Sequence, residues 1–250
     1  MVSRLQSCHR KSFDHSQWGL CWAGFIVLMW FVSLIAAFTL PTTQTHAAYL
    51  LGGVFVRTFL HTGLFIVTHE AIHNNISNSR KLNAVFGYIT SWLYALLPYR
   101  LLAKNHRLHH RFPATEQDPD HHSQETNGFW AWYVKFMKTY QSGKQVWVSL
   151  IGISIIFCIF MMCQVPIVNS ILFWIIPMVI SSLQLFTFGI FLPHCQSADE
   201  SELPHCIKSI NLPVFWSFMA CYHFGYHLEH HLNPRLPWYQ LPQVYKDGKV

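Results

Sequence analysis

Four long apolar segments follow one another along the chain, and polar stretches separate them. They cover roughly residues 18–40, 48–68, 146–163 and 170–192. About twenty apolar residues in a helix are enough to cross the hydrocarbon layer of a bilayer, so each segment is predicted to be a transmembrane helix. Two shorter apolar stretches, at 84–98 and 213–222, are predicted to form interfacial or partly inserted helices. The pattern therefore predicts an all-α integral membrane protein.

Lys and Arg residues fall on one side of these predicted spans. The turns at 41–47 and 164–169 contain none, whereas sixteen of the seventeen Lys and Arg residues belong to the other side; the last, Arg57, lies within the second span. Cytoplasmic loops of membrane proteins carry an excess of these residues. We therefore expect two helical hairpins, with the N-terminus and the long polar segments in the cytoplasm. The first span exceeds the apolar core of a signal peptide, and we expect it to be retained.

Composition supports a membrane protein and narrows its partners. The chain is 52% hydrophobic and 11% charged, with a mean hydropathy of +0.23, against about 25% charged residues in soluble domains. Its net charge of +6 comes without a Lys/Arg run, so we expect the lipid bilayer as a partner and no nucleic acid. There is no GxGxxG, Walker A or haem-attachment motif. Any redox partner is therefore expected to be a separate protein.

Histidines gather in three short groups beside the apolar segments. The groups are His69 and His73; His106, His109 and His110; and His227, His230 and His231. On a helix, residues three or four apart share one face, so each group directs its rings at one place. Neutral imidazole is the commonest metal ligand, and eight rings exceed the needs of one ion. Because the expected topology brings all three groups to the cytoplasmic side, the sequence predicts a site for two metals there.

Other polar residues extend this predicted site. His194 ends the fourth span, and His223 precedes His227 by four residues, so both are further candidate ligands. Glu70, Glu229, Asp118 and Asp120 are candidates for carboxylates that orient ligating rings through their outer N–H, or are simply solvated on a helix or in a loop. Arg57 and His61 share the helix face of His69 and His73. They are expected either to line a channel above the metals or, alternatively, to be a pair inside the helix bundle or a snorkelling arginine.

Residues His69 to His73 also spell HExxH, the motif of zinc metalloproteases in which the glutamate is the general base. A zinc hydrolase needs three protein ligands and one open position. That interpretation leaves most of the clustered histidines without a role. A non-enzymatic membrane protein that binds a pigment or haem through histidines is another alternative, and its haem would need only paired histidines on facing helices.

At the histidine groups the chain resembles the membrane fatty-acid desaturase and hydroxylase superfamily, and within it the bacterial β-carotene 4-ketolases of the cyanobacterial type. The similarity runs from about Thr62 to Leu241, so residues 1–250 are expected to form one desaturase-like domain. The similar stretches are Thr62-Gly-Leu-Phe-Ile, Trp92-Leu-Tyr, Leu97-Pro-Tyr99, Asp118-Pro-Asp120, Phe136-Met-Lys138, Phe191-Leu-Pro-His194, Cys221-Tyr-His-Phe-Gly-Tyr-His227, Glu229-His-His231 and Pro237-Trp238.

The resemblance implies a non-haem di-iron centre held by the three histidine groups and His194; His223 is an extension of that set. It implies an O₂-dependent oxygenase that converts C4 of β-ionone rings to a ketone, taking β-carotene to echinenone and canthaxanthin. The electron donor is expected to be a ferredoxin-type protein and the location a bacterial inner or thylakoid membrane. A fatty-acyl desaturase or hydroxylase with the same metal cage is the alternative.

Overall fold

The structure is a computed structural model, and it describes residues 16–122, 128–194 and 207–248. Within these ranges the chain is helical, with no strand. The longer helices are α1 (Ser16–Phe38), α2 (Ala47–His73), α3 (Arg80–Ala95), α4 (Tyr99–Arg111), α5 (Phe129–Tyr140), α6 (Lys144–Met162) and α8 (Ile176–Leu185). The shorter ones are α7 (Ile167–Ser170), η3 (Ile171–Ile175), η4 (Phe186–Phe191), α9 (Leu192–His194), α10 (Val214–Cys221), α11 (His227–Leu232), η7 (Trp238–Gln240) and α12 (Leu241–Asp247).

Four helices in the described part of the chain are long and apolar enough to cross a membrane, as the hydropathy pattern predicts. They are Trp18–Phe38, Ala47–His73, Lys144–Met162 and the composite helix Ile167–His194. The two shorter apolar stretches form α3 and α10. The chain is thus an all-helical integral membrane protein, while the predicted cytoplasmic N-terminus falls on residues 1–15, outside the described ranges.

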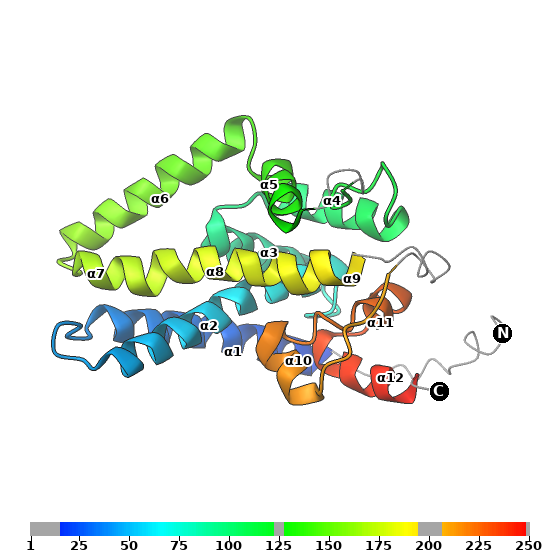
Figure 1. Cartoon of the computed structure of the whole chain (residues 1–250), viewed down its shortest axis with the longest axis horizontal. Helices are drawn as coiled ribbons and strands as arrows, with labels where there is room; N and C mark the ends of the chain where they lie inside the picture. Colours follow the sequence, from blue (N-terminus) through cyan, green and yellow to red (C-terminus); the bar gives the residue numbers. More distant parts are fainter. Residues whose placement is uncertain (1–15, 123–127, 195–206, 249–250) are drawn as a thin grey trace.

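Helix α2 lies at the centre of the bundle. It packs against α1, α3 and α8, and Figure 1 shows it between α1 and the long helix that ends at α9. Leu64 and Ile66 on α2 are fully buried. The helix ends directly after His73, because Asn74 adopts the left-handed conformation and its backbone N–H bonds to the carbonyl groups of Glu70 and Ala71. The last turn of α2, with its histidines, is therefore held inside the bundle.

The fourth span contains two π-helical segments, η3 and η4, separated by α8. Such wide turns insert an extra residue into an α-helix and are frequent at functional sites. At its start, the side chain of Asn169 donates to the carbonyl groups of Ala37 and Leu40, both at 2.8 Å. The end of α1 is thereby fastened to the start of the fourth span, at the opposite end of the bundle from α9 (Figure 1).

Helix α6 leans away from the rest of the bundle (Figure 1). Of its side chains only that of Ser149 is buried, while Leu150, Ile155 and Ile159 are exposed. An exposed apolar helix of this kind is stable when lipid surrounds it. The α6 surface is therefore the clearest lipid-facing element of the protein.

Two amphipathic helices, α4 and α5, were not among the predicted elements. Helix α4 carries the second histidine group, which the apolar pattern places in a polar loop. Because the helix is polar, the hydropathy pattern does not predict it, although the spacing of His106, His109 and His110 is helical. Pro98 precedes the first turn of α4, where the absence of a proline N–H costs nothing.

Candidate metal centre

The folded chain brings nine histidines into two adjacent groups. In each group the nearest ring nitrogens all lie within 4.8 Å of one another. The first group consists of His69, His73, His106, His110 and His230, and the second of His109, His194, His227 and His231. Their helices α2, α4, α9 and α11 meet at one end of the bundle (Figure 1). The three sequence motifs therefore lie close together in space.

Each of the last two sequence motifs is divided between the two groups. On α4, His106 and His110 are four residues apart and join the first group, whereas His109 lies on a neighbouring face and joins the second. On α11 the pattern reverses, because His227 and His231 join the second group and His230 the first. The i,i+4 pairs share a face, and the residue between them points to the other side. Both helices thus run between two centres.

In the first group, imidazole nitrogens face one another directly. The Nε2 atoms of His73 and His106 are 2.7 Å apart, and those of His69 and His230 are 3.1 Å apart. His110 Nε2 lies 3.0 Å from the Nε2 atoms of both His106 and His230. Two neutral rings facing each other nitrogen to nitrogen share at most one proton. Five converging rings are therefore a poor hydrogen-bonding arrangement and a good set of cation ligands.

The second group is likewise better suited to a cation than to hydrogen bonding, as the hydrogen bonds on the outer side of its rings indicate. His194 Nδ1 donates to the carbonyl oxygen of Ile190 at 2.7 Å, so its Nε2 carries a lone pair, and this buried atom has no partner. His109 Nδ1 lies 3.0 Å from both oxygens of Asp118, and its Nε2 faces that of His231 at 3.0 Å. Lone pairs are thus directed at a common point without a donor to meet them, which fits a bound metal ion.

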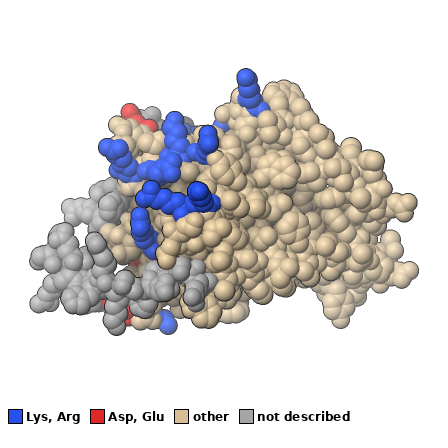
Figure 2. Space-filling view, turned by 180° about the vertical axis from the view of Figure 1, so that it is seen from behind, with Lys and Arg blue, Asp and Glu red and all other residues tan. Residues whose placement is uncertain are grey.

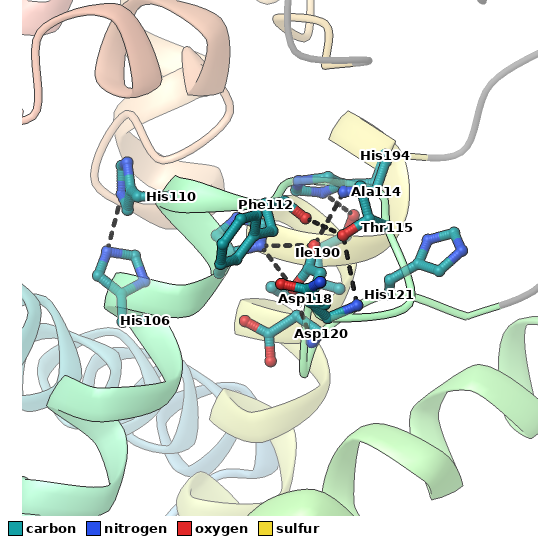
Figure 3. A network of polar contacts seen from close by, with 12 residues as sticks. His106, His110, Phe112, Ala114, Thr115, Asp118, Asp120, His121, Ile190 and His194 are labelled. Atoms are coloured by element: carbon teal, nitrogen blue, oxygen red, sulfur yellow. Dashed lines mark hydrogen bonds and ion pairs between the residues drawn. The ribbon is translucent and has the colours of Figure 1, made fainter.

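Asp118 is the carboxylate that orients His109. Besides the ring, it accepts hydrogen bonds from the backbone N–H groups of Ala114 and Asp120, at 3.0 and 2.9 Å (Figure 3). Burial alone would raise the pKa of Asp118, but these bonds and His109 lower it below its usual value. The carboxylate therefore stays charged and holds the proton on His109 Nδ1. Of the two placements that the sequence leaves open for Asp118, beside a ring or solvated in a loop, this one lies beside a ring.

Four of the imidazoles outside the spanning helices are held in the neutral form that binds metals. Burial, followed by the neighbouring rings, lowers the pKa of His106, His227, His230 and His231 well below the usual value. For His109 burial also lowers the pKa, but the hydrogen bond to Asp118 together with the charges of Asp120 and Asp118 outweighs it, and the pKa is raised. His109 is thus the exception among these five rings.

Asp120 is placed differently from Asp118. Its Oδ1 accepts a hydrogen bond from the hydroxyl group of Tyr140 at 2.7 Å, and the side chain lines a cavity instead of meeting a ring nitrogen. Burial, with a smaller contribution from Asp118, raises the pKa of Asp120 to about 6. Figure 3 shows the two carboxylates pointing in different directions.

The cavity is small and apolar, with a volume of about 50 Å³, and it touches both histidine groups. His69 and His106 of the first group and His109 and His227 of the second contribute to its wall. The rest of the wall is Phe65, Ile72, Leu102, Asp120, Phe136, Tyr140, Leu185, Gly189, Ile190 and Phe224. Phe136 and Tyr140 lie on helix α5, which the hydropathy pattern does not predict, so the sequence did not point to them as part of the site.

His223 is not brought into either histidine group among the described residues. Its ring stacks on Tyr226, with centroids 5.7 Å apart and an interplanar angle of 10°. Helix α10 ends at Cys221, and both Tyr222 and His223 have positive φ angles of 47° and 63°. The four-residue spacing from His227 therefore does not lie on one helix, and the rule that nominated His223 does not apply there.

Glu70 does not occupy the position of a protease base. Its Oε2 accepts a hydrogen bond from the side-chain amide of Asn75 at 3.1 Å, and Oε1 lies 3.3 Å from Nδ1 of His69, the outer nitrogen of that ring. The carboxyl group thus lies behind a candidate ligand rather than in front of an open metal position. This geometry disfavours the zinc-protease interpretation of the HExxH motif.

Arg57 and His61 belong to a separate buried network. Arg57 donates to the backbone carbonyl groups of Trp30 and Phe173, at 2.7 and 2.9 Å. His61 accepts from the indole N–H of Trp30 at 3.2 Å, and its Nε2 lies 2.8 Å from the carbonyl oxygen of Tyr94. These bonds join α1, α2, α3 and η3. Of the two expectations for this pair, the structure favours the one inside the bundle.

The chain is similar to several known proteins over most of its length. A beta-carotene ketolase of Paracoccus sp. (strain PC1) is 34% identical over 227 residues, 89% of this chain and 90% of that protein. A second, from Paracoccus sp. (strain N81106 / MBIC 01143), is 31% identical over 228 residues, 90% of this chain and 91% of its own length. A zeaxanthin 4-ketolase of Chlamydomonas reinhardtii is 32% identical over 228 residues, covering 88% of this chain and 49% of its own length.

No solved structure matches the chain. The fatty acid desaturase family matches residues 44–249, which include all nine grouped histidines. A histidine-only donor set with paired groups fits the non-haem iron that the resemblance implies. The chain is therefore a member of the fatty acid desaturase family, and its full-length relatives include beta-carotene ketolases.

Proposed function

We propose that the protein is a membrane oxygenase that introduces keto groups at C4 and C4′ of the β-ionone rings of carotenoids, converting β-carotene to echinenone and canthaxanthin. The observation that carries this proposal is an apolar cavity that touches both histidine groups. An apolar ring that enters it meets the two candidate metal positions together. The full-length similarity to two beta-carotene ketolases supports the choice of substrate.

Nine histidines would hold the metals, five around one iron ion and four around the other. Bound non-haem di-iron supplies the activation of O₂ and the oxidising power for the C–H bond. Asp118 would fix the tautomer and orientation of His109, and Ile190 does the same for His194. The protein's part is to hold these rings rigidly before the metals bind, within one desaturase-like domain that spans residues 1–250.

The remaining wall of the cavity would bind the substrate and exclude water. Leu102, Leu185 and Phe224 offer only apolar contacts, which suits a hydrocarbon ring that arrives from the lipid phase. The cavity is smaller than a whole terpenoid ring, so entry requires lining side chains to move. Phe136 is half-buried at this wall and is the side chain best placed to do so.

We infer that the four spans form two hairpins with the metal centre on the cytoplasmic side of a bacterial inner or thylakoid membrane. Figure 2 shows Lys and Arg side chains gathered at one end of the molecule, while the larger part of that face carries no charge. This distribution agrees with the positive-inside rule. The charged end includes α4, on which Lys104, Arg107 and Arg111 are exposed.

These α4 cations suggest where a ferredoxin-type electron donor would dock. They lie on the outer face of the helix whose inner face carries His106, His109 and His110. An acidic protein attracted to this face would be separated from both centres by the thickness of one helix. Anionic lipid headgroups would attract the same cations, and charge reversal at Arg107 and Arg111 separates the two, since only docking makes donor-dependent turnover fall.

A fatty-acyl desaturase or hydroxylase is the second candidate, because the family match alone does not distinguish it. The decisive experiment is expression in cells that accumulate β-carotene, followed by chromatography of the pigments and analysis of the lipids. We expect echinenone and canthaxanthin. Unchanged pigment with altered acyl chains would establish the second candidate, and a Soret band in the purified protein would instead indicate haem.

A further inference from the structure

The wall of the cavity contains one polar feature that the metals do not explain. Apart from the four candidate ligands, its only polar side chains among the described residues are those of Asp120 and Tyr140. Asp120 is 95% buried, with 5% of its surface exposed. A carboxyl group is costly to place in an apolar wall unless it has a partner. The hydroxyl group of Tyr140 supplies a partner for one of its oxygens, and the other oxygen can accept a hydrogen bond from a ligand.

Three hydrogen bonds hold Asp120, two through its backbone and one through its carboxyl group. Its backbone carbonyl oxygen accepts from the indole N–H of Trp132 at 2.9 Å, and its backbone N–H donates to Asp118 at 2.9 Å. The hydroxyl group of Tyr140 engages Oδ1 at 2.7 Å. In the described ranges no hydrogen bond reaches Oδ2. One acceptor oxygen is thus preorganised and left for a group in the cavity.

We propose that Asp120, supported by Tyr140, is the specificity-determining residue that binds a hydroxyl group on the substrate ring. This inference rests on the proposed function. A CH₂ group that becomes a ketone passes through an alcohol, so the ring carries a hydroxyl group at C4 after the first oxidation. Carotenoids that already bear a ring hydroxyl group at C3 present the same chemistry. In both cases the alcohol O–H donates to Oδ2 of Asp120.

The recognition has a clear energetic reason. An apolar wall binds a hydrocarbon ring and its alcohol almost alike, whereas a buried acceptor that is otherwise unpaired favours the alcohol strongly. Burial raises the pKa of Asp120 to about 6; either protonation state leaves an oxygen that accepts a hydrogen bond. Asp120 and Tyr140 would hold the ring that carries the C4 hydroxyl group beside both histidine groups until its second oxidation.

The test compares wild type, Asp120→Leu, Asp120→Asn and Tyr140→Phe in cells that make β-carotene and in cells that make zeaxanthin. If the C4 alcohol is the ligand, Asp120→Leu should release 4-hydroxy pigment from β-carotene, raising the ratio of alcohol to ketone about tenfold or more. If the C3 hydroxyl is the ligand, the ratio of ketolated zeaxanthin to ketolated β-carotene should fall by a similar factor. Asp120→Asn retains an acceptor oxygen and should show the smaller change.

Phe136→Leu is the matched control, because it alters the same wall without removing a polar group. It should lower conversion of both pigments alike and leave the alcohol-to-ketone ratio unchanged. If Asp120→Leu behaves in the same way, with iron per chain and protein level as in wild type, Asp120 only supports the fold and the inference is overturned.

Pigment that copurifies with the protein keeps this inference separate from the proposed function. From cells containing β-carotene and zeaxanthin together, the wild-type protein should retain the hydroxylated pigment preferentially, and Asp120→Leu should lose this preference. A preference that survives in Asp120→Leu would overturn the inference. Absence of every keto pigment in wild-type cells would instead overturn the proposed function, while the retention ratio still decides the role of Asp120.

Discussion

Two regions of this protein bury histidine, and they use it in opposite ways. His61, in the network with Arg57, has both ring nitrogens engaged, one by the indole of Trp30 and the other by the carbonyl group of Tyr94. In the histidine groups the outer nitrogen of a ring such as His109 or His194 is bonded, while the inner one faces other imidazoles or nothing. Complete satisfaction marks a structural histidine, and a bonded outer nitrogen with an unmatched inner lone pair marks a ligand.

The distinction between structural and ligating histidines fails most directly if a histidine of either group can be removed without loss of bound metal. His109→Ala and His230→Ala each delete one ligand from a different group. We expect each to lower iron affinity by more than about a hundredfold, since even the orienting partners of ligands contribute about 10–100-fold, and to abolish keto pigment. Iron per chain and pigment analysis measure both. Full iron content in either variant would show that the ring is structural; His223→Phe is the control that keeps its iron.

Asp118→Asn tests the hydrogen bond on the outer side of the His109 ring. The amide can present an N–H to His109 Nδ1 and so favour the wrong tautomer, which would point a proton at the metal position. We expect iron affinity to fall by about 10–100-fold, measured by competition with a chelator. Asp120→Asn, which changes a carboxylate of the same loop that meets no ring nitrogen, should leave the affinity unchanged. An equal loss in both variants would indicate a general effect on the loop.

His61→Phe addresses the structural side of the comparison. The change leaves the indole N–H of Trp30 and the carbonyl group of Tyr94 without partners. Each buried group left unpaired costs about 1–3 kcal/mol, so the free energy of unfolding should fall by that order. Thermal unfolding in detergent measures the loss, and iron per folded chain should match wild type. Loss of iron from folded protein would contradict the assignment of His61 to the framework.

The smallest effect concerns His223, which is buried but outside both groups. Burial lowers the pKa of His223 from 6.5 to about 4, so the folded form keeps the ring neutral where the unfolded chain binds a proton. The stability that depends on the neutral ring is complete above pH 6.5 and declines as the pH falls from 6.5 towards 4. His223→Phe should flatten this part of the stability curve. An unchanged pH dependence of the unfolding midpoint would show that His223 does not contribute.

Much of this fold follows from local patterns in the sequence. The four spans are predicted because their apolar runs match the thickness of a bilayer, and the histidine motifs because helix spacing aligns their rings. Helix α4 was not predicted because its sequence is polar. Helix α5 was not predicted either, so Tyr140 and Phe136 were missing from the expected site. A search of 129–140 for helical periodicity, rather than for hydropathy alone, is the signal that finds α5.

Such local patterns do not predict how the ligands are divided between the two centres. The spacing of the α4 motif does not predict that His109 lies with His227 and His231 rather than with the other histidines of α4. This depends on how α4 and α11 pack. The same holds for Asp118 and Asp120, which the sequence treats as equivalent and the fold separates. Local spacing can also mislead, as at His223, where positive φ angles interrupt the helix that the spacing assumes.

The π-helical segment η4 has a consequence for the second group. Phe186–Phe191 lies directly before α9, so its extra residue sets the rotational phase at which His194 leaves the fourth span. One residue corresponds to about 100° of rotation around an α-helix. Regular α-helical winding over the same number of residues would therefore turn His194 away from His109 and His227, whereas the wide turn absorbs one residue and keeps the direction of the ring. The widened turn thus sets the angle of a side chain that lies beyond it, and in homologues the number of residues and the width of the turn would have to change together.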